Sequence, residues 1–185
     1  MPQITVVNRQ ELFAHEGRLK DSASQAVERL RSYPEQGLDL LFKIKFEPVG
    51  RHPMEDRDLN LIEQVNQTFT YLTSFRAAHI LFGLHEGLDD GLRLNLGTQS
   101  GSDIESIEPG LVAAEVFAAV RPENNRKLCK DMDKIASSGA NHKYVFFYSP
   151  GYLSGRHPEL EFREGVEVWV VSGMPPIKSV ENHGP

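Results

Sequence analysis

The spacing of apolar positions along the chain predicts three helices. Apolar residues recur every three to four positions over residues 9–33 and again over residues 57–82, a period typical of helices with one buried face. Pro34 and Gly37 end the first of these segments. Residues 122–138 have the same period and open with a proline, which is tolerated in the first turn of a helix.

Shorter apolar runs bounded by turn residues predict strands. The clearest run is residues 110–120, "GLVAAEVFAAV", which is flanked by Pro-Gly and Arg-Pro pairs and is apolar enough for a strand buried on both faces. The run 38–46, "LDLLFKIKF", predicts either a strand or an apolar linker. Further strands are expected at residues 92–99, in "SDIESIEPG", at 143–149 and at 165–171.

The order of these elements predicts the fold class. A helix, three strands, a helix and a further strand follow one another in the central part of the chain, which favours an α/β fold with a mixed central sheet flanked by helices. The strand–helix–strand unit supplies a parallel pair of strands. A chain of 185 residues can bury a sizeable core, so one domain is expected over residues 1–185, with a flexible C-terminal tail over about 173–185.

Composition narrows the class of protein. The net charge of −6 counts against a surface that holds nucleic acid by bulk positive charge, but not against an enzyme that meets phosphates through bound metal ions. Cys129 is the single cysteine, which excludes an intrachain disulfide and a multi-cysteine zinc site. No apolar run has the length of a membrane span, and the first residues lack the layout of a signal peptide, so a cytoplasmic protein is expected.

Glu115 lies at the centre of the most apolar predicted strand. Because side chains alternate across a strand, it shares one face with Ala113 and Phe117. An ionised carboxylate buried there without a partner would cost several kcal/mol, roughly, or would shift its pKa and become neutral. Glu115 therefore requires a metal ion, a basic side chain or open water, and a plain salt bridge or an exposed strand edge would satisfy it as well.

Two further acids are candidates for the same site. Asp103 precedes a short strand that one Pro-Gly turn separates from the Glu115 strand, so antiparallel pairing would bring the two carboxylates together. Glu63 lies at the edge of the apolar stripe of the 57–82 helix, where an ordinary solvated glutamate is the alternative. Mg²⁺ prefers a few carboxylate oxygens and keeps several waters. Asp103, Glu115 and Glu63 are thus the expected metal ligands.

The element order, the Asp of "GSDIES" and the Glu of "AAEVFAAV" resemble the PD-(D/E)XK nuclease superfamily over about residues 57–150. The resemblance implies a restriction endonuclease-like core, expected here over about 57–172, with an added N-terminal helix. It implies Mg²⁺-dependent hydrolysis of phosphodiester bonds in nucleic acid, DNA being the expected substrate, and Mn²⁺ can substitute for Mg²⁺. It assigns the two strand acids to Asp103 and Glu115 and the helix acid to Glu63.

The chain departs from this superfamily at the motif lysine, where it has Phe117, and at the motif proline, where it has Ser102. Some members recruit the lysine from the following helix, whose candidates here are Lys127, Lys130 and Lys134. At about 100° per residue from the buried Leu128, Lys127 lies beside the buried face while Lys130 points to solvent. Lys127 is therefore the predicted catalytic lysine, and its ammonium is expected within reach of Glu115 or of a metal-bound water.

Two other hypotheses remain at this stage. Phe117 and the negative net charge favour a catalytically inactive nuclease-like domain that binds nucleic acid or a protein partner. A small-molecule enzyme that uses the same carboxylates is the third. A homodimer would suit the leading hypothesis, because paired cuts in a duplex need two sites.

Overall fold

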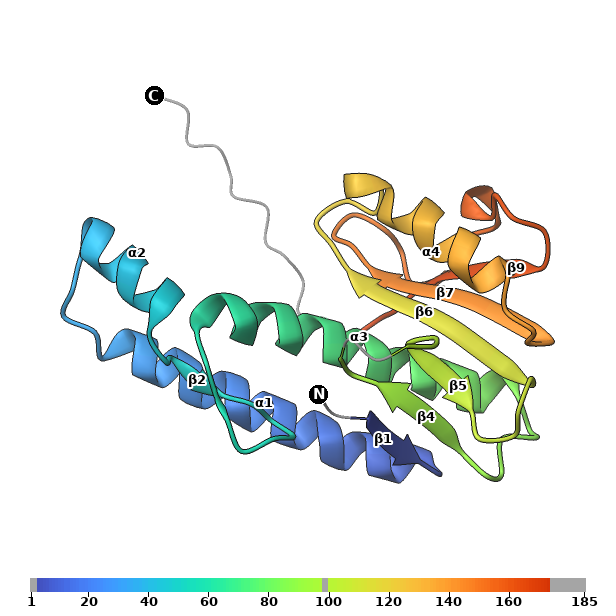
Figure 1. Cartoon of the computed structure of the whole chain (residues 1–185), viewed down its shortest axis with the longest axis horizontal. Coiled ribbons are helices and arrows are strands. Elements are labelled where there is room, and N and C mark those ends of the chain that lie inside the picture. Colours follow the sequence, from blue (N-terminus) through green and yellow to red (C-terminus); the bar gives the residue numbers. More distant parts are fainter. Residues whose placement is uncertain (1–2, 98–99, 174–185) are drawn as a thin grey trace.

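The computed structural model describes residues 3–97 and 100–173, and a seven-stranded mixed sheet forms its centre (Figure 1). The strands of this sheet, in spatial order, are β1 (Gln3–Val6), β4 (Leu92–Asn95), β5 (Ile104–Ser106), β6 (Val112–Ala118), β7 (His142–Tyr148), β9 (Val166–Val170) and β8 (Gly155–Arg156). The expected mixed α/β architecture is therefore confirmed. The tail expected at 173–185 lies, apart from Gly173, outside the described residues.

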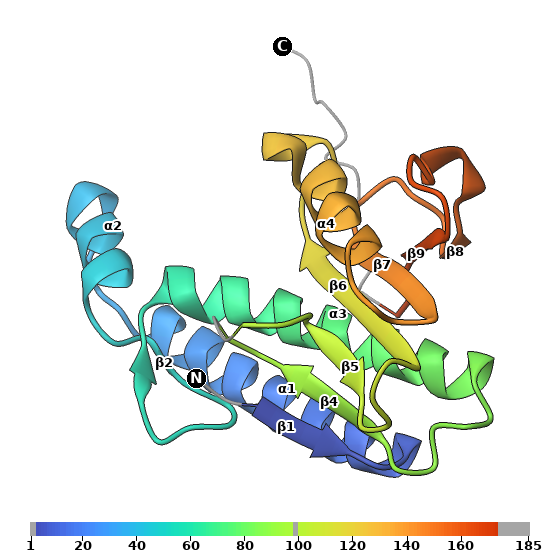
Figure 2. The ribbon, with the colours of Figure 1, turned by 45° about the vertical axis from the view of Figure 1, so that its right-hand side comes forward.

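Four α-helices accompany the sheet in the described part of the chain: α1 (Arg9–Arg31), α2 (Gly37–Phe46), α3 (Leu61–Leu84) and α4 (Lys127–Ala136). The smaller elements are a two-stranded ribbon of β2 (Gly50–Arg51) and β3 (Asp58–Leu59) and two 3₁₀ helices, Asn124–Arg126 and Pro158–Leu160. Helices α1 and α3 lie side by side on one face of the sheet, and α4 lies on the other (Figures 1 and 2). Every described helix is too short or too polar to cross a bilayer.

Most predicted elements are present, and one is wrong. The long helices predicted at 9–33 and 57–82 are α1 and α3, and the helix predicted at 122–138 is α4 with a 3₁₀ turn before it. The run 38–46 forms a helix, α2, rather than a strand or a linker. A short apolar run has no period that separates a helix from a strand, so its neighbours decide.

The strand pairing follows from the connections. Strands β4, β5 and β6 follow one another along the chain, and each pairs antiparallel with the next. The crossover through α4 makes β6 and β7 parallel, and β9 adds to β7 in the same direction. The order α3, β4, β5, β6, α4, β7 therefore matches the predicted order of helix, three strands, helix and strand.

The side chains of β6 alternate between two hydrophobic clusters, one on each face of the sheet. Val112, Ala114 and Val116 pack with α1 and α3, whereas Ala113 and Phe117 pack with α4. The burial of this strand on both faces explains why it reads as a continuous apolar run. Glu115 has the parity of Ala113 and Phe117, so it lies on the α4 face of the sheet.

Candidate functional site

Asp103 and Glu115 come together where β5 begins beside β6. The two strands are antiparallel with Ile104 opposite Ala114. Asp103 immediately precedes β5, so the same register continued by one residue places it opposite Glu115, on the same face. The N–H of Val116 donates a hydrogen bond to Asp103 Oδ2 at 2.7 Å, which fixes the Asp103 side chain against β6. The structure thus joins the two strand acids as the turn between them predicts.

Lys134 is the basic partner of Glu115. Its Nζ lies 2.8 Å from both carboxylate oxygens and donates a hydrogen bond to Oε2. The Glu115 side chain is 2% exposed and that of Lys134 is 51% exposed, so the lysine covers a buried carboxylate from the solvent side. Oε1 is ion-paired with the same ammonium and accepts no hydrogen bond from any other described residue. The Lys134 ammonium is thus the partner of both oxygens of this buried carboxylate.

Lys127, the lysine predicted from the sequence, binds another acid. Its Nζ donates to Asp131 Oδ1 at 2.6 Å, one helical turn further along α4, and lies 5.8 Å from the centre of the Phe117 ring. The direct partner of the Lys127 ammonium is therefore Asp131 and not Glu115, and its reach to a metal-bound water stays a prediction. Asp131 is itself buried, and among the described residues its Oδ2 has no hydrogen-bond partner.

The direction of α4 explains this exchange of lysines. The helix returns antiparallel to β6, so its first turn lies beside the end of the strand. Glu115 lies three residues before the end of β6, roughly 10 Å back along the strand. Lys134 lies seven residues beyond Lys127, which is roughly 10 Å along the helix and within about 20° of the same side. Seven-residue spacing was the signal in the sequence that could have identified Lys134.

The structure does not bring Glu63 to this cluster, contrary to prediction. Helix α3 packs against the opposite face of the sheet, with Val116 rather than Glu115. Glu63 instead forms a capping box with Asn60: the Glu63 N–H donates to Asn60 Oδ1 at 2.9 Å, and the Asn60 N–H donates to Glu63 Oε2 at 3.1 Å. Its ion pair at 3.7 Å is with Arg57. Glu63 therefore has a structural role at the start of α3.

Burial controls the protonation of the three acids on the α4 face. Burial, and then the charge of Asp103, raise the pKa of Glu115 to about 7, against the opposing effect of Lys134. Burial also raises the pKa of Asp103 and of Asp131, although the Val116 N–H and the Lys127 ammonium respectively oppose it. Burial of Lys134 is outweighed by its hydrogen bond to Glu115 and by the carboxylate charges, which raise the pKa of Lys134. A cation added to this cluster would favour the ionised acids.

Phe117 cannot be replaced by lysine without disturbing a core. Its side chain is buried, and its ring stacks on that of Phe147 with the two centroids 5.4 Å apart. Leu128 and Met132 of α4 belong to the same cluster. A lysine at this position would carry its charge into this apolar contact, so α4 is the element from which a lysine can reach Glu115.

The sheet face beside the cluster is polar and open. Helix α4 covers β6, β7 and β9, and no described helix packs on this face of β1, β4 and β5 (Figure 2). The side chains on the open face are those of Gln3, Thr5, Arg93, Asn95 and Glu105. A pocket of about 340 Å³, lined in part by Arg93, Glu105 and Ala113, lies there. We call these five residues the polar face; Asp103, Glu115 and Lys134 do not line its pocket.

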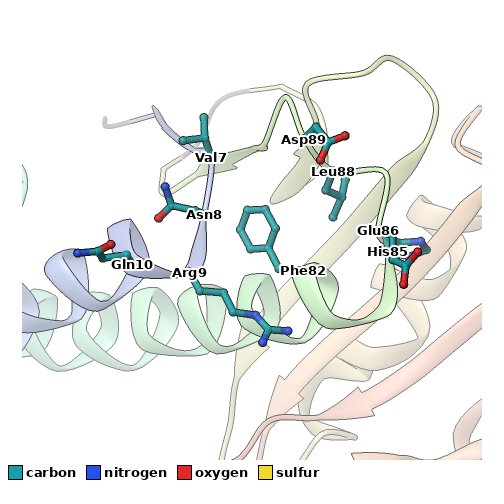
Figure 3. A pocket seen from close by; sticks show the side chains of 9 residues that line it. All are labelled: Val7, Asn8, Arg9, Gln10, Phe82, His85, Glu86, Leu88 and Asp89. Carbon is teal, nitrogen blue, oxygen red and sulfur yellow. The ribbon is translucent and has the colours of Figure 1, made fainter.

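A larger pocket lies elsewhere. Its volume is about 510 Å³, and it lies between the start of α1 and the end of α3 (Figure 3). Phe82 occupies its middle, with Asn8 and Asp89 to its sides and Arg9 below. None of the clustered acids and lysines lines it. The volume of a pocket therefore does not identify where the clustered acids and lysines of this molecule lie.

Comparison with protein-family models, with curated proteins and with solved structures finds no match for this chain. Among residues 3–97 and 100–173, no group of three or more His, Cys, Asp or Glu side chains is arranged to hold a metal ion. Asp103 and Glu115 form a pair of carboxylates, with Asp131 held by Lys127 beside them. The functional assignment therefore depends on the geometry of this cluster.

Proposed function

We propose that the chain is a metal-dependent nuclease with a restriction endonuclease-like core, in which Asp103, Glu115 and Lys134 form the active site. The observation that carries the proposal is the Lys134 ammonium at 2.8 Å from a buried carboxylate on the strand next to Asp103. The order α3, β4, β5, β6, α4, β7 supports it, because it is the element order of that nuclease core. In this proposal Lys134 has the role of catalytic lysine that was predicted from the sequence for Lys127.

The residues present suit a magnesium ion. Mg²⁺ is commonly bound through one or two carboxylates, with waters and substrate phosphate oxygens completing its shell. Asp103 and Glu115 would hold it, and at Glu115 the ion would share the carboxylate with the Lys134 ammonium, which lies 2.8 Å from Oε1. Bound there, the ion would supply an activated water and offset charge on the phosphate.

The chain's own groups have distinct roles in this proposal. Lys134, half exposed above Glu115, presents an ammonium that can orient a water or stabilise charge on a phosphate oxygen. The Val116 N–H holds Asp103 in place. The polar face would bind the sugar-phosphate backbone of the nucleic acid. Arg93, which lies 3.7 Å from Glu105, offers its positive charge to a phosphate.

The test is a cleavage assay with DNA and RNA substrates in Mg²⁺ and in Mn²⁺. Lys134→Ala is expected to lower the rate by about 10²–10⁴-fold, the range for a positioned proton-transfer group. Lys130→Ala is the matched control, because Lys130 is an exposed lysine on the same helix, and it should keep the wild-type rate. Equal rates for the two variants would remove Lys134 from the mechanism.

A second candidate function is a nuclease-like domain that binds nucleic acid without cutting it. The ion pair between Lys134 and Glu115 favours it, because a metal ion must compete with an ammonium already in place. In the cleavage assay this candidate gives no product with either metal ion. A mobility-shift assay would then show binding that Arg93→Ala weakens and Lys130→Ala does not.

A further inference from the structure

Helix α2 exposes an apolar face to solvent. None of its ten residues, all of which are described, is buried. Four large apolar side chains on it are 59–80% exposed, and we call them the α2 patch: Leu38, Leu41, Phe42 and Phe46. Their spacing of three, four and eight positions from Leu38 places them on one face of the helix. This face therefore lacks a cover within the described part of the chain.

A ten-residue helix in this position requires burial of its apolar face to be stable. Figures 1 and 2 show α2 projecting from the body of the molecule near the start of α3. On its inner side, Leu40 and Ile44 are only partly buried. Helices shorter than about 12–15 residues are marginal in water and depend on packing of an apolar face. The exposed face of α2 is thus a surface whose burial would stabilise the helix.

The exposed apolar area is close to what a dimer requires. Helix α3, which α2 contacts, exposes three more apolar side chains in its first half: Ile62, Val65 and Phe69. The four side chains of the α2 patch expose roughly 450 Å², and the three of α3 bring the total to roughly 700 Å², if each side chain has on the order of 150–200 Å². A standard interface buries about 800 Å² per partner.

We propose that the α2 patch is the contact surface of a homodimer, in which α2 packs antiparallel against α2 of a second copy. The sequence of the helix is self-complementary for this arrangement. A two-fold axis at Phe42 places residues three positions before it beside those three positions after it, so Asp39 meets Lys45 of the second copy. At four positions, Leu38 meets Phe46 of the second copy. Opposite charges and apolar side chains thus pair with each other.

The charge of the segment disfavours a membrane as the occupant. Helices that lie on anionic membranes concentrate Lys and Arg on the side away from the apolar face. Here Lys45 lies within the apolar face, its Nζ 5.4 Å from the centre of the Phe46 ring. Residues 35–47 contain two lysines and three acids, and the whole chain has a net charge of −6. Attraction to anionic lipid is therefore weak, whereas a second copy supplies matching charges.

The experiment measures the mass of the chain in solution by light scattering at micromolar concentration. The wild type is expected at twice the 20.8 kDa chain mass, and Leu38→Glu/Phe42→Glu at the chain mass. Because neither residue is buried, the variant should keep the wild-type circular dichroism and melting temperature. Leu153→Glu is the matched control: Leu153 is 84% exposed and lies outside the patch, so this variant should remain a dimer.

A second readout tests the antiparallel arrangement. In a Cys129→Ser background, Phe42→Cys should form an intermolecular disulfide under oxidised glutathione, and Leu38→Cys should not, because the antiparallel arrangement places the two copies of residue 38 roughly 12 Å apart along the helices whereas a parallel one would bring them together. A monomeric wild type would overturn the proposal, as would a dimer that survives Leu38→Glu/Phe42→Glu. Binding of the monomer to phosphatidylserine-containing vesicles, lost in the double variant, would overturn it in favour of a membrane. None of these results depends on nuclease activity.

Discussion

The protonation of Glu115 leads to a measurable dependence of stability on pH. The pKa of Glu115 is raised from 4.5 to about 7 in the folded protein, so between these values the folded state holds a proton that the unfolded chain has released. Stability from this group is therefore present below pH 4.5 and is lost as pH rises to 7. At about 1.4 kcal/mol per pH unit, the loss is about 3 kcal/mol. The group is almost fully buried, so solvent does not reduce this value much.

Glu115→Gln isolates this contribution, because glutamine has nearly the same volume and does not titrate. The buried His52 and the partly buried His79, whose pKa values burial lowers, oppose Glu115, because their contribution to stability is lost as pH falls. They are common to both proteins and cancel in the comparison. Urea unfolding from pH 4.5 to pH 8 should show the variant gaining about 3 kcal/mol relative to the wild type. A difference that stays constant with pH would refute the assignment of a raised pKa to Glu115.

Two further predictions concern residues beside the site. Asn60→Ala is expected to lower the free energy of unfolding by about 1 kcal/mol through loss of the capping box and to leave any cleavage rate unchanged; a lost rate would return Glu63 to the site. Phe117→Lys is expected to cost about 3 kcal/mol or more in urea unfolding, because its ring is 4% exposed and stacked on Phe147. Phe117→Leu is its milder control, and an equally stable lysine variant would contradict the packing described for this position.

The elements that could be predicted from the sequence are long helices with a regular apolar stripe and strands bounded by turn residues nearby in the sequence. Helices α1 and α3 are long enough for their stripes to be unambiguous. Strand β1 has only four residues and is paired with β4, far along the chain, so no local pattern identifies it. The apolar residues of α2 gave no period, because this helix exposes one apolar face and half-buries the other.

The strand residues of the candidate site could be identified from the sequence, but its helix residue could not. One turn joins β5 to β6, so the pairing of Asp103 with Glu115 follows from local chemistry. The choice between Lys127 and Lys134 depends on how far α4 extends back along β6, which requires the rise of both elements to be counted. The position of Glu63 depends on which face of the sheet α3 covers, and the edge of an apolar stripe does not determine that.

The pairing of β1 with β4 also sets an order of folding. Strands β4, β5 and β6 join residues that are near in sequence, such as Glu105 and Ala113, whereas β1 joins residues 92 positions apart. Closing the longer loop costs about 2 kcal/mol more in chain entropy, so β1 is expected to dock after the central hairpins have formed. Strand β1, the first in chain order among the described strands, is thus among the last to find its partner. Gln3 and Thr5 reach the polar face at that late step.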